Sequence, residues 1–129
     1  MRQYVIAQLV HEHVMVKVFG IKNCSTMKKA FDWLDAHGIP YDFHDYKKFG
    51  VTQEQLSGWA GKVGWEPLLN TRGTTWRGLS DEERTDVNEA RAIELMCTKP
   101  SLVKRPVIEH DGRILVGFDE ATYHKELGA

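Results

Sequence analysis

The fold is decided by residues 16–46, which read VKVFGIKNCSTMKKAFDWLDAHGIPYDFHDY. The first five residues, 16–20, form a β-branched and aromatic run that ends in glycine, a pattern typical of a strand. Apolar residues then recur at helical spacing along one face of residues 25–37, and Gly38 is placed to end that helix. Residues 41–46 alternate like a second strand. The stretch therefore predicts a β-α-β unit.

Helices dominate the middle of the chain. A capping box at Thr52 opens an apolar stripe that predicts a helix ended by Gly64. A polar loop is expected over residues 70–78. A second capping box, at Ser80, precedes a further apolar stripe, so a helix is expected there that stops before Pro100.

The C-terminal part predicts a hairpin and a last helix. Asp111 and Gly112 stand between two apolar runs, which is a strong hairpin signal, and Asp119 can cap a helix behind them. The predicted fold is α/β, with a small mixed sheet flanked by helices and a helical insertion after the second strand. We expect residues 15–129 to form one domain. Residues 1–14 are expected to be an extension, either disordered or the product of an upstream start, with Met15 as an alternative start.

Composition excludes several classes of protein. The 129 residues carry 17 Lys and Arg against 18 Asp and Glu, a net charge of −1, which argues against binding nucleic acid or an anionic membrane through general charge. No segment approaches the ~18–20 apolar residues of a transmembrane helix, and no signal peptide is evident. Cys24 and Cys97 are too few for a thiolate zinc site, and no histidine cluster completes one, so no metal is expected. We expect free thiols in a cytoplasmic protein.

Cys24 is the candidate nucleophile, because it stands where the first predicted strand meets the first predicted helix. The unpaired amides of residues 25–27 and the positive end of the helix favour an anion there. Lys22, Lys28 and Lys29 are nearby cations that would help to lower the pKa of the thiol. The alternative is that Cys24 is only a small apolar residue near a helix cap.

Three segments carry a resemblance to a known family. Residues 20–30 (GIKNCSTMKKA), 68–77 (LLNTRGTTWR) and 102–108 (LVKRPVI) resemble, in order, the active-site segment and two further signatures of the ArsC (arsenate reductase) family. That family is a branch of the thioredoxin-like fold, and the resemblance extends from about Met15 to the end of the chain. The similarity is greatest to its YffB-type branch of proposed glutathione-dependent thiol reductases.

The resemblance implies roles for single residues. Cys24 matches the nucleophile, and Arg105 matches one of three arginines that serve the oxyanion in arsenate reductases. The other two matching positions hold Asn70 and Gly117. Each lost guanidinium removes charge-assisted hydrogen bonds of typically about 1.5–3 kcal/mol, so efficient reduction of arsenate is not expected.

Further residues are implied to bind the anion or the substrate. Ser25 and Thr26 offer first-turn amides, and Pro106 matches the cis-proline beside the thiol of thioredoxin-like proteins. Arg72 and Arg77 either replace part of the missing charge or hold the carboxylates of glutathione.

The residues that follow Cys24 exclude a cycle of the CxxC type, with two neighbouring thiols. Met27 stands where a dithiol enzyme has its second cysteine. Cys97 shares a helical face with apolar residues, so we expect it in the core rather than as a distant resolving thiol. An external thiol is then needed to resolve the Cys24 adduct.

The expected function is a cytoplasmic thiol oxidoreductase that binds no cofactor and takes glutathione as co-substrate. Its partners would be glutathione or a small oxidised thiol or oxyanion substrate, with glutaredoxin as a further partner and neither nucleic acid nor membrane. A first alternative is an arsenate reductase linked to glutathione and glutaredoxin. A second alternative, of another class, is a Spx-like regulatory module that binds RNA polymerase.

Overall fold

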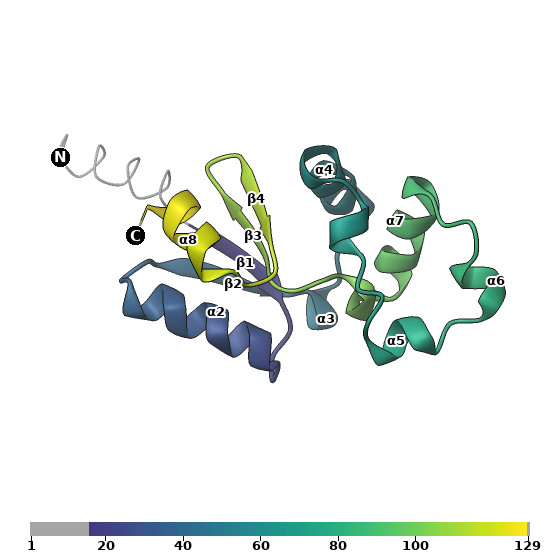
Figure 1. Cartoon of the computed structure of the whole chain (residues 1–129), viewed down its shortest axis with the longest axis horizontal. Coiled ribbons are helices and arrows are strands. Elements are labelled where there is room, and N and C mark those ends of the chain that lie inside the picture. The colour runs from purple at the N-terminus through teal and green to yellow at the C-terminus, as the bar shows by residue number, and fades with distance from the viewer. Residues whose placement is uncertain (1–15, 129) are drawn as a thin grey trace.

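The computed structural model describes residues 16–128, so the expected extension over residues 1–14 and the alternative start at Met15 lie outside the described residues. Four strands form one mixed sheet in the order β2-β1-β3-β4. Their bounds are β1 (Val16–Gly20), β2 (Tyr41–Asp45), β3 (Val107–His110) and β4 (Arg113–Val116). β1 pairs in parallel with β2 and antiparallel with β3, and β3 pairs antiparallel with β4 (Figure 1). The predicted mixed sheet is confirmed.

Helices and 3₁₀ turns connect the strands. Their bounds are α2 (Ser25–Ala36), α3 (Tyr46–Phe49), α4 (Gln53–Val63), η1 (Glu66–Leu68), α5 (Thr74–Arg77), α6 (Asp81–Arg84), α7 (Glu89–Thr98), η2 (Pro100–Leu102) and α8 (Glu120–Leu127). Everything from α3 to η2 lies between the second and third strands, which is the helical insertion expected from the sequence. Within residues 16–128, no helix is long and apolar enough to cross a membrane.

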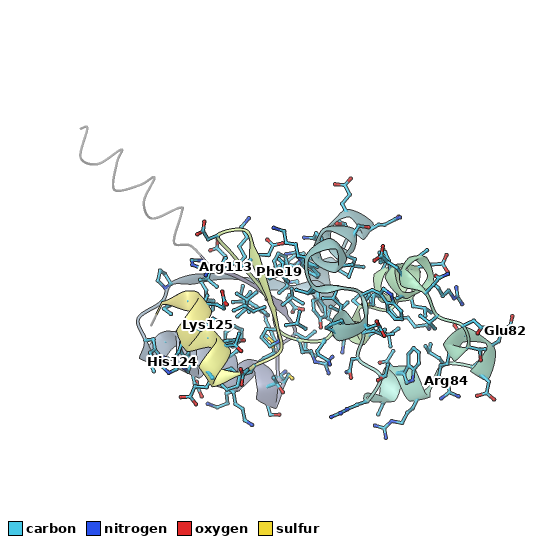
Figure 2. All side chains as sticks on the ribbon, turned by 45° about the horizontal axis from the view of Figure 1, so that its top comes forward. Phe19, Glu82, Arg84, Arg113, His124 and Lys125 are labelled. Carbon is cyan, nitrogen blue, oxygen red and sulfur yellow. The ribbon has the colours of Figure 1, made fainter. Side chains whose placement is uncertain are left out.

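Two clusters of buried side chains hold the molecule together. The smaller cluster packs α2 and α8 against the sheet, and the larger cluster packs the helical insertion against it. Because successive side chains of a strand point to opposite faces, Val18 enters the smaller cluster and Phe19 the larger. Figure 1 shows α2 and α8 grouped on one side of the molecule and α4 to α7 on the other. Phe19 lies between the sheet and the insertion, with its ring 5.0 Å from that of Trp59 (Figure 2).

The local signals near the strands act as expected. Thr52 accepts a hydrogen bond from the amide of Gln55 (3.0 Å), and the capping box at the start of α4 is complete. In the hairpin, Asp111 and Gly112 have φ values of 50° and 75° and join β3 to β4. Two positive φ values suit a tight hairpin turn, because their backbone twist matches that of the flanking strands.

The polar region between residues 70 and 100 differs from the prediction in two ways. The expected loop over residues 70–78 contains the one-turn helix α5. The single helix expected from Ser80 is two helices, since Asp86 adopts a left-handed conformation (φ 54°) and Asn88 caps a new start by accepting from the amide of Arg91 (2.9 Å). Local capping by asparagine competes with helix continuation, and it prevails here.

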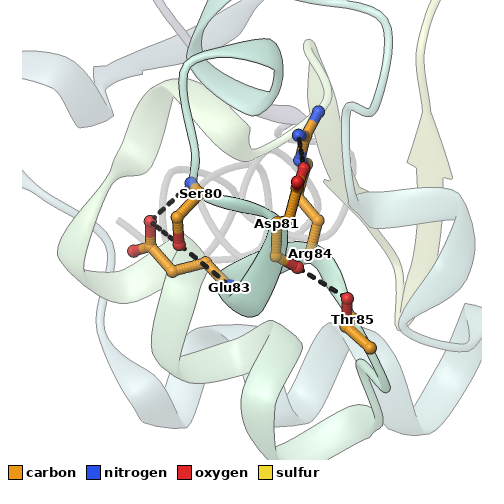
Figure 3. Close-up of polar contacts among 5 residues, drawn as sticks. All are labelled: Ser80, Asp81, Glu83, Arg84 and Thr85. Carbon is orange, nitrogen blue, oxygen red and sulfur yellow. Dashed lines mark hydrogen bonds and ion pairs between the residues drawn. The ribbon is translucent and has the colours of Figure 1, made fainter.

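The single turn of α6 is stabilised by a complete capping box at its start. The Ser80 hydroxyl accepts from the amide of Glu83 (3.1 Å), and the Glu83 carboxylate accepts from the amide of Ser80 (2.9 Å) (Figure 3). Asp81 and Arg84 form an ion pair at 2.5 Å on the same turn. These contacts satisfy the amides at the helix start without any long apolar stripe.

Candidate active site

Cys24 occupies the N-cap position of α2, as the sequence predicted. Its backbone is extended (φ −123°, ψ 131°), and its carbonyl accepts the first helical hydrogen bond from the amide of Lys28 (3.0 Å). The chain reaches this position by a turn at Asn23, which has a φ of 58°. A Cβ added at Gly20 would lie 2.3 Å from the side chain of buried Met27, so glycine lets the end of β1 approach the first turn of α2 closely.

The environment of Cys24 favours the thiolate. Burial acts to raise the pKa of the thiol. Hydrogen bonds from the amide of Met27, the guanidinium of Arg105 and the amide of Thr26 act in the opposite direction, as does the charge of Arg105. These contacts prevail, and the pKa of Cys24 lies below its ordinary value. A thiolate stabilised by helix amides and a cation has the properties of a nucleophilic cysteine.

Arg105, and not a lysine of the first helix, is the cation that hydrogen bonds to the sulfur of Cys24. The side chains of Lys22, Lys28 and Lys29 belong to exposed residues, and Lys28 pairs with Asp32 at 2.7 Å. The expectation that these three lysines assist the thiol is therefore corrected. That expectation rested on proximity in the sequence alone. Side chains near the start of a helix can point outward, while a loop that is distant in sequence reaches the thiol.

The guanidinium of Arg105 is held in place by two oxygen atoms. Its Nη1 donates to the carbonyl of Ser101 (3.2 Å), and it also hydrogen bonds to the hydroxyl of Tyr46. Tyr46 is fully buried and donates from Oη to the carbonyl of Val103 at 2.6 Å. Burial is the main reason why the pKa of Tyr46 rises to about 12, so the hydroxyl keeps its proton at neutral pH. Tyr46 was not among the predicted site residues, because the alternating pattern of residues 41–46 indicates only the end of a strand there.

A cavity of about 250 Å³ opens beside the thiol. The residues that line it come from four separate segments of the chain: Cys24, Thr26, Asn70, Lys104, Arg105 and Gly117. All three positions at which the resemblance expects arginine, namely Asn70, Arg105 and Gly117, therefore meet at one place. Lys104 supplies a second cation, and it was not among the predicted site residues. The available signal was its position next to Arg105 in the third signature.

Pro106 is buried and directly follows Arg105, one of the residues that line this cavity. The Arg105–Pro106 peptide bond is cis, as the resemblance implied. The Pro106 carbonyl accepts from the amide of Gly117 (2.8 Å). This contact joins the segment that follows β4 to the segment that precedes β3.

The remaining predicted site residues lie around the cavity rather than in it. Ser25 is exposed and lines a separate hollow on another side of Cys24. Arg72 lines a groove next to the cavity, and its amide donates to the side chain of Asn70 (3.1 Å). Arg77 donates to the carbonyl of Arg72 (2.9 Å), within its own loop. Among the residues that line the cavity, Lys104 therefore supplies the charge that sequence analysis had sought from Arg72 and Arg77.

Cys97 lies apart from this site. Its side chain packs against the larger core cluster and donates to the carbonyl of Val51 at 3.5 Å, whereas Cys24 packs against the smaller cluster. This placement agrees with the expectation that Cys97 belongs to the core. Among residues 16–128, no group of three or more His, Cys, Asp and Glu side chains could hold a metal ion.

The fold and the site together define a class of protein: a thioredoxin-like domain with a thiol at the start of its first helix and a cis-proline loop beside it. The sequence model of the ArsC family matches residues 19–126. The chain belongs to the ArsC family.

Similar proteins agree with this assignment. A solved structure described as the YffB (PA3664) protein is 50% identical, covers 87% of this chain and 98% of its own, and superposes with a TM-score of 0.84. An uncharacterised protein of Haemophilus influenzae is 40% identical over 84% of this chain and 96% of its own length. A more distant relative, 27% identical over 82% of this chain and 78% of its own length, is the global transcriptional regulator Spx of Streptococcus mutans.

Proposed function

We propose that this chain is a thiol reductase of the cytoplasm that uses Cys24 as nucleophile and glutathione as reductant. The observation that carries the proposal is the cavity in which the Cys24 thiol, its lowered pKa and the cations Arg105 and Lys104 meet. A thiolate at an open, positively charged site attacks a disulfide readily, because the departing sulfur also carries negative charge.

The proposed reaction has two thiol–disulfide exchanges. The Cys24 thiolate bonds to the glutathione sulfur of a mixed disulfide R–S–S–G, the S–S bond of the substrate breaks, and R leaves as a thiolate that takes up a proton from water. A second glutathione, as its thiolate, then attacks the Cys24–glutathione disulfide, releasing oxidised glutathione and the Cys24 thiolate. Overall, one R–S–S–G is reduced to R–SH by one glutathione, which ends in oxidised glutathione.

The need for an external thiol follows from the positions of the side chains. Met27, in the first turn of α2, is buried and cannot form a disulfide. Cys97 packs in the other core cluster. Resolution by a second glutathione, or by glutaredoxin as a partner, therefore fits the site better than an internal disulfide.

Arsenate reduction is a second candidate, favoured by the family and by the convergence of the three oxyanion positions on one cavity. Only Arg105 among those three positions carries a guanidinium, although Lys104 adds a charge. A tetrahedral oxyanion would thus find fewer charge-assisted donors here than at three arginines. We propose arsenate as the poorer substrate.

A regulatory binding module is a candidate of another class, favoured by the similarity to Spx of Streptococcus mutans. The proposed enzyme and this alternative differ in what they require of Cys24. An enzyme needs the Cys24 thiolate in every turnover, whereas a module that only binds a partner does not need it.

A paired assay tests these alternatives. The full chain is given a glutathione mixed disulfide with glutathione in one assay and arsenate with glutathione and glutaredoxin in the other. We expect turnover of the mixed disulfide, slower turnover of arsenate, and loss of both in Cys24→Ser. The matched variant Cys97→Ser should keep most of its activity, since that thiol lies in the core. Equal losses in the two variants would contradict the proposed cycle, and inactivity of the native chain in both assays would favour the binding module.

A further inference from the structure

A second hollow lies next to the thiol cavity, and the proposed reaction with glutathione does not account for it. Its volume is about 740 Å³, compared with about 250 Å³ for the cavity. We call it the basic groove and define it by its aromatic and charged lining residues: Trp65, Glu66, Arg72, Trp76, Arg84 and Lys104. It runs along the helical insertion, between the segment around η1 and the short helices α5 and α6.

The basic groove and the thiol cavity share one wall. Leu69 and Val103 form an antiparallel bridge, flanked by hydrogen bonds of 2.7 Å from the amide of Asn70 to the carbonyl of Leu102 and from the amide of Lys104 to the carbonyl of Leu68. Asn70 faces the cavity, and Lys104 lines both hollows. The hydrogen-bonded pair of segments therefore fixes the groove at a set position relative to the Cys24 sulfur.

The charges of the groove are mostly positive. Three cations face one carboxylate, that of Glu66. Arg84 is paired with Asp81 at 2.5 Å (Figure 3), but neither Arg72 nor Lys104 forms an ion pair with any of residues 16–128. Both of these cations are exposed, so each can bind a carboxylate without breaking an existing pair.

Two tryptophans give the groove a firm apolar floor. Trp65 and Trp76 are half-buried and pack against the larger core cluster while still lining the groove. Side chains that are anchored on one side lose little freedom when a ligand covers the other side. Aromatic surface between cations suits a polypeptide, which offers apolar contacts between its charged groups.

We propose that the basic groove binds an acidic polypeptide segment next to the modified cysteine of a glutathionylated substrate protein. The inference rests on the proposed function, and it names the class of substrate. With glutathione at Cys24, the segment passes Lys104 and places its carboxylates near Arg72. The chemical step is the first exchange described above: the Cys24 thiolate takes the glutathione sulfur, and the polypeptide leaves as its thiol.

The test compares two peptides with one glutathionylated cysteine each. One has Asp and Glu beside the cysteine, the other has Lys at the same positions, and hydroxyethyl–glutathione disulfide serves as the small substrate. The native full chain should show a kcat/KM about tenfold higher for the acidic peptide, mainly through KM, and the preference should shrink as salt is raised. Equal values for the two peptides would overturn the proposal.

A matched pair of charge reversals locates the effect. Arg72→Glu should abolish the preference for the acidic peptide, a ratio from which any change in the binding of glutathione cancels because both peptides carry it. Lys125→Glu makes the same change in net charge on α8, at the opposite end of the molecule from Arg84 and the groove (Figure 2), and should retain the preference. If both variants change the preference equally, net charge rather than the groove is responsible, and the proposal fails.

A binding measurement separates this inference from the proposed function. The same two peptides, with serine in place of the modified cysteine, are titrated into the native chain and into Arg72→Glu by calorimetry. Tighter binding of the acidic peptide to the native chain alone supports the groove even if no turnover is found in any assay. Equal binding of both peptides rejects the groove even if the small disulfide is reduced. Displacement of the acidic peptide by a short single-stranded DNA at equal concentration would assign the groove to nucleic acid instead.

Discussion

Arg105 shows how a single side chain decides the chemistry at Cys24. Its guanidinium is part-buried, and it is fixed between the carbonyl of Ser101 and the hydroxyl of Tyr46. Tyr46 is in turn fixed by the carbonyl of Val103. A cation held in this way stabilises the thiolate without having to be reoriented when the thiolate forms. The reactivity of the thiol therefore depends also on Ser101 and Tyr46, which do not line the cavity.

Removing the guanidinium should make Cys24 less acidic. In Arg105→Met the thiolate loses a hydrogen bond and a positive charge, both of which lower the pKa of Cys24 in the native protein. We expect the pKa of Cys24 to rise, so the pH profile of alkylation by iodoacetamide moves to higher pH and the rate at neutral pH falls. The control Arg91→Met removes a half-buried α7 arginine that pairs with Glu94, and it should leave the profile in place. An unchanged profile in Arg105→Met would show that the helix amides alone stabilise the thiolate.

Tyr46 should act as a positioning residue for Arg105. Tyr46→Phe removes the hydroxyl that contacts Arg105 and leaves the buried Val103 carbonyl without its donor, which typically costs about 1–3 kcal/mol of unfolding free energy. We expect both a lower urea midpoint and a higher pKa of Cys24.

Tyr123→Phe is the matched control for that variant. Tyr123 is also buried and donates from its hydroxyl to a backbone carbonyl, that of Gly117, at 2.8 Å. This variant should lose a similar amount of stability while the pKa of Cys24 stays in place. A rise of the thiol pKa in both variants would mean that loosening of the fold, and not the contact with Arg105, causes it.

At the scale of elements, four helices of the insertion, α3, α4, α6 and α7, begin at a residue whose side chain caps the helix. α3, α5 and α6 each span four residues, and such short helices are stable only within a folded protein. α4 is the longest helix of the insertion and carries Leu56 and Trp59 into the larger cluster. The stability of its first turn therefore affects how the insertion packs against the sheet.

The capping box of α4 should contribute measurably to stability. Thr52→Ala removes the oxygen that accepts from the amide of Gln55, and loss of an N-cap of this kind costs about 1 kcal/mol. The measurement is the urea midpoint of the purified chain. Ser57→Ala, on the exposed surface of the same helix, should be neutral or slightly stabilising, because alanine favours helix. A loss in Ser57→Ala as large as that in Thr52→Ala would contradict the assignment.

At the scale of the whole molecule, each core cluster contains one buried tyrosine. Tyr46 lies in the larger cluster and Tyr123 in the smaller. Burial raises the pKa of both phenols, that of Tyr46 to about 12. The native state therefore keeps phenolic protons that the unfolded chain gives up above its ordinary tyrosine pKa of 10.0.

Stability should accordingly fall in alkali. The contribution of Tyr46 is fully present below pH 10 and is lost as the pH rises through about 12, a change of about 3 kcal/mol. Urea unfolding followed from pH 9 to 12 should show this decline, and the decline should be smaller in Tyr46→Phe. Parallel curves for the native chain and the variant would rule out Tyr46 as its source.

The parts of the fold that were predicted correctly depend on neighbours in sequence. A β-branched and aromatic run marked β1, alternation marked β2, spacing marked α2, and turn residues marked the hairpin. The errors fell where two local signals competed. The capping box at Ser80 and the apolar stripe after it suggested one helix, but Asn88 caps a separate start. α5 has no apolar stripe, so nothing in its sequence distinguished it from a loop.

The sequence by itself determined that Cys24 would cap α2, because an N-cap is defined by the residues on either side of it. It also carried the family signatures that include Arg105 and Pro106. Only the tertiary structure decided that Arg105 and Lys104, rather than Lys22, Lys28 and Lys29, supply the charge at the cavity, and that Tyr46 holds Arg105. The physical reason is the distance along the sequence over which each interaction acts. Capping and turn interactions join residues a few positions apart. A cation from a distant loop reaches the thiol only after the sheet and the insertion have folded together.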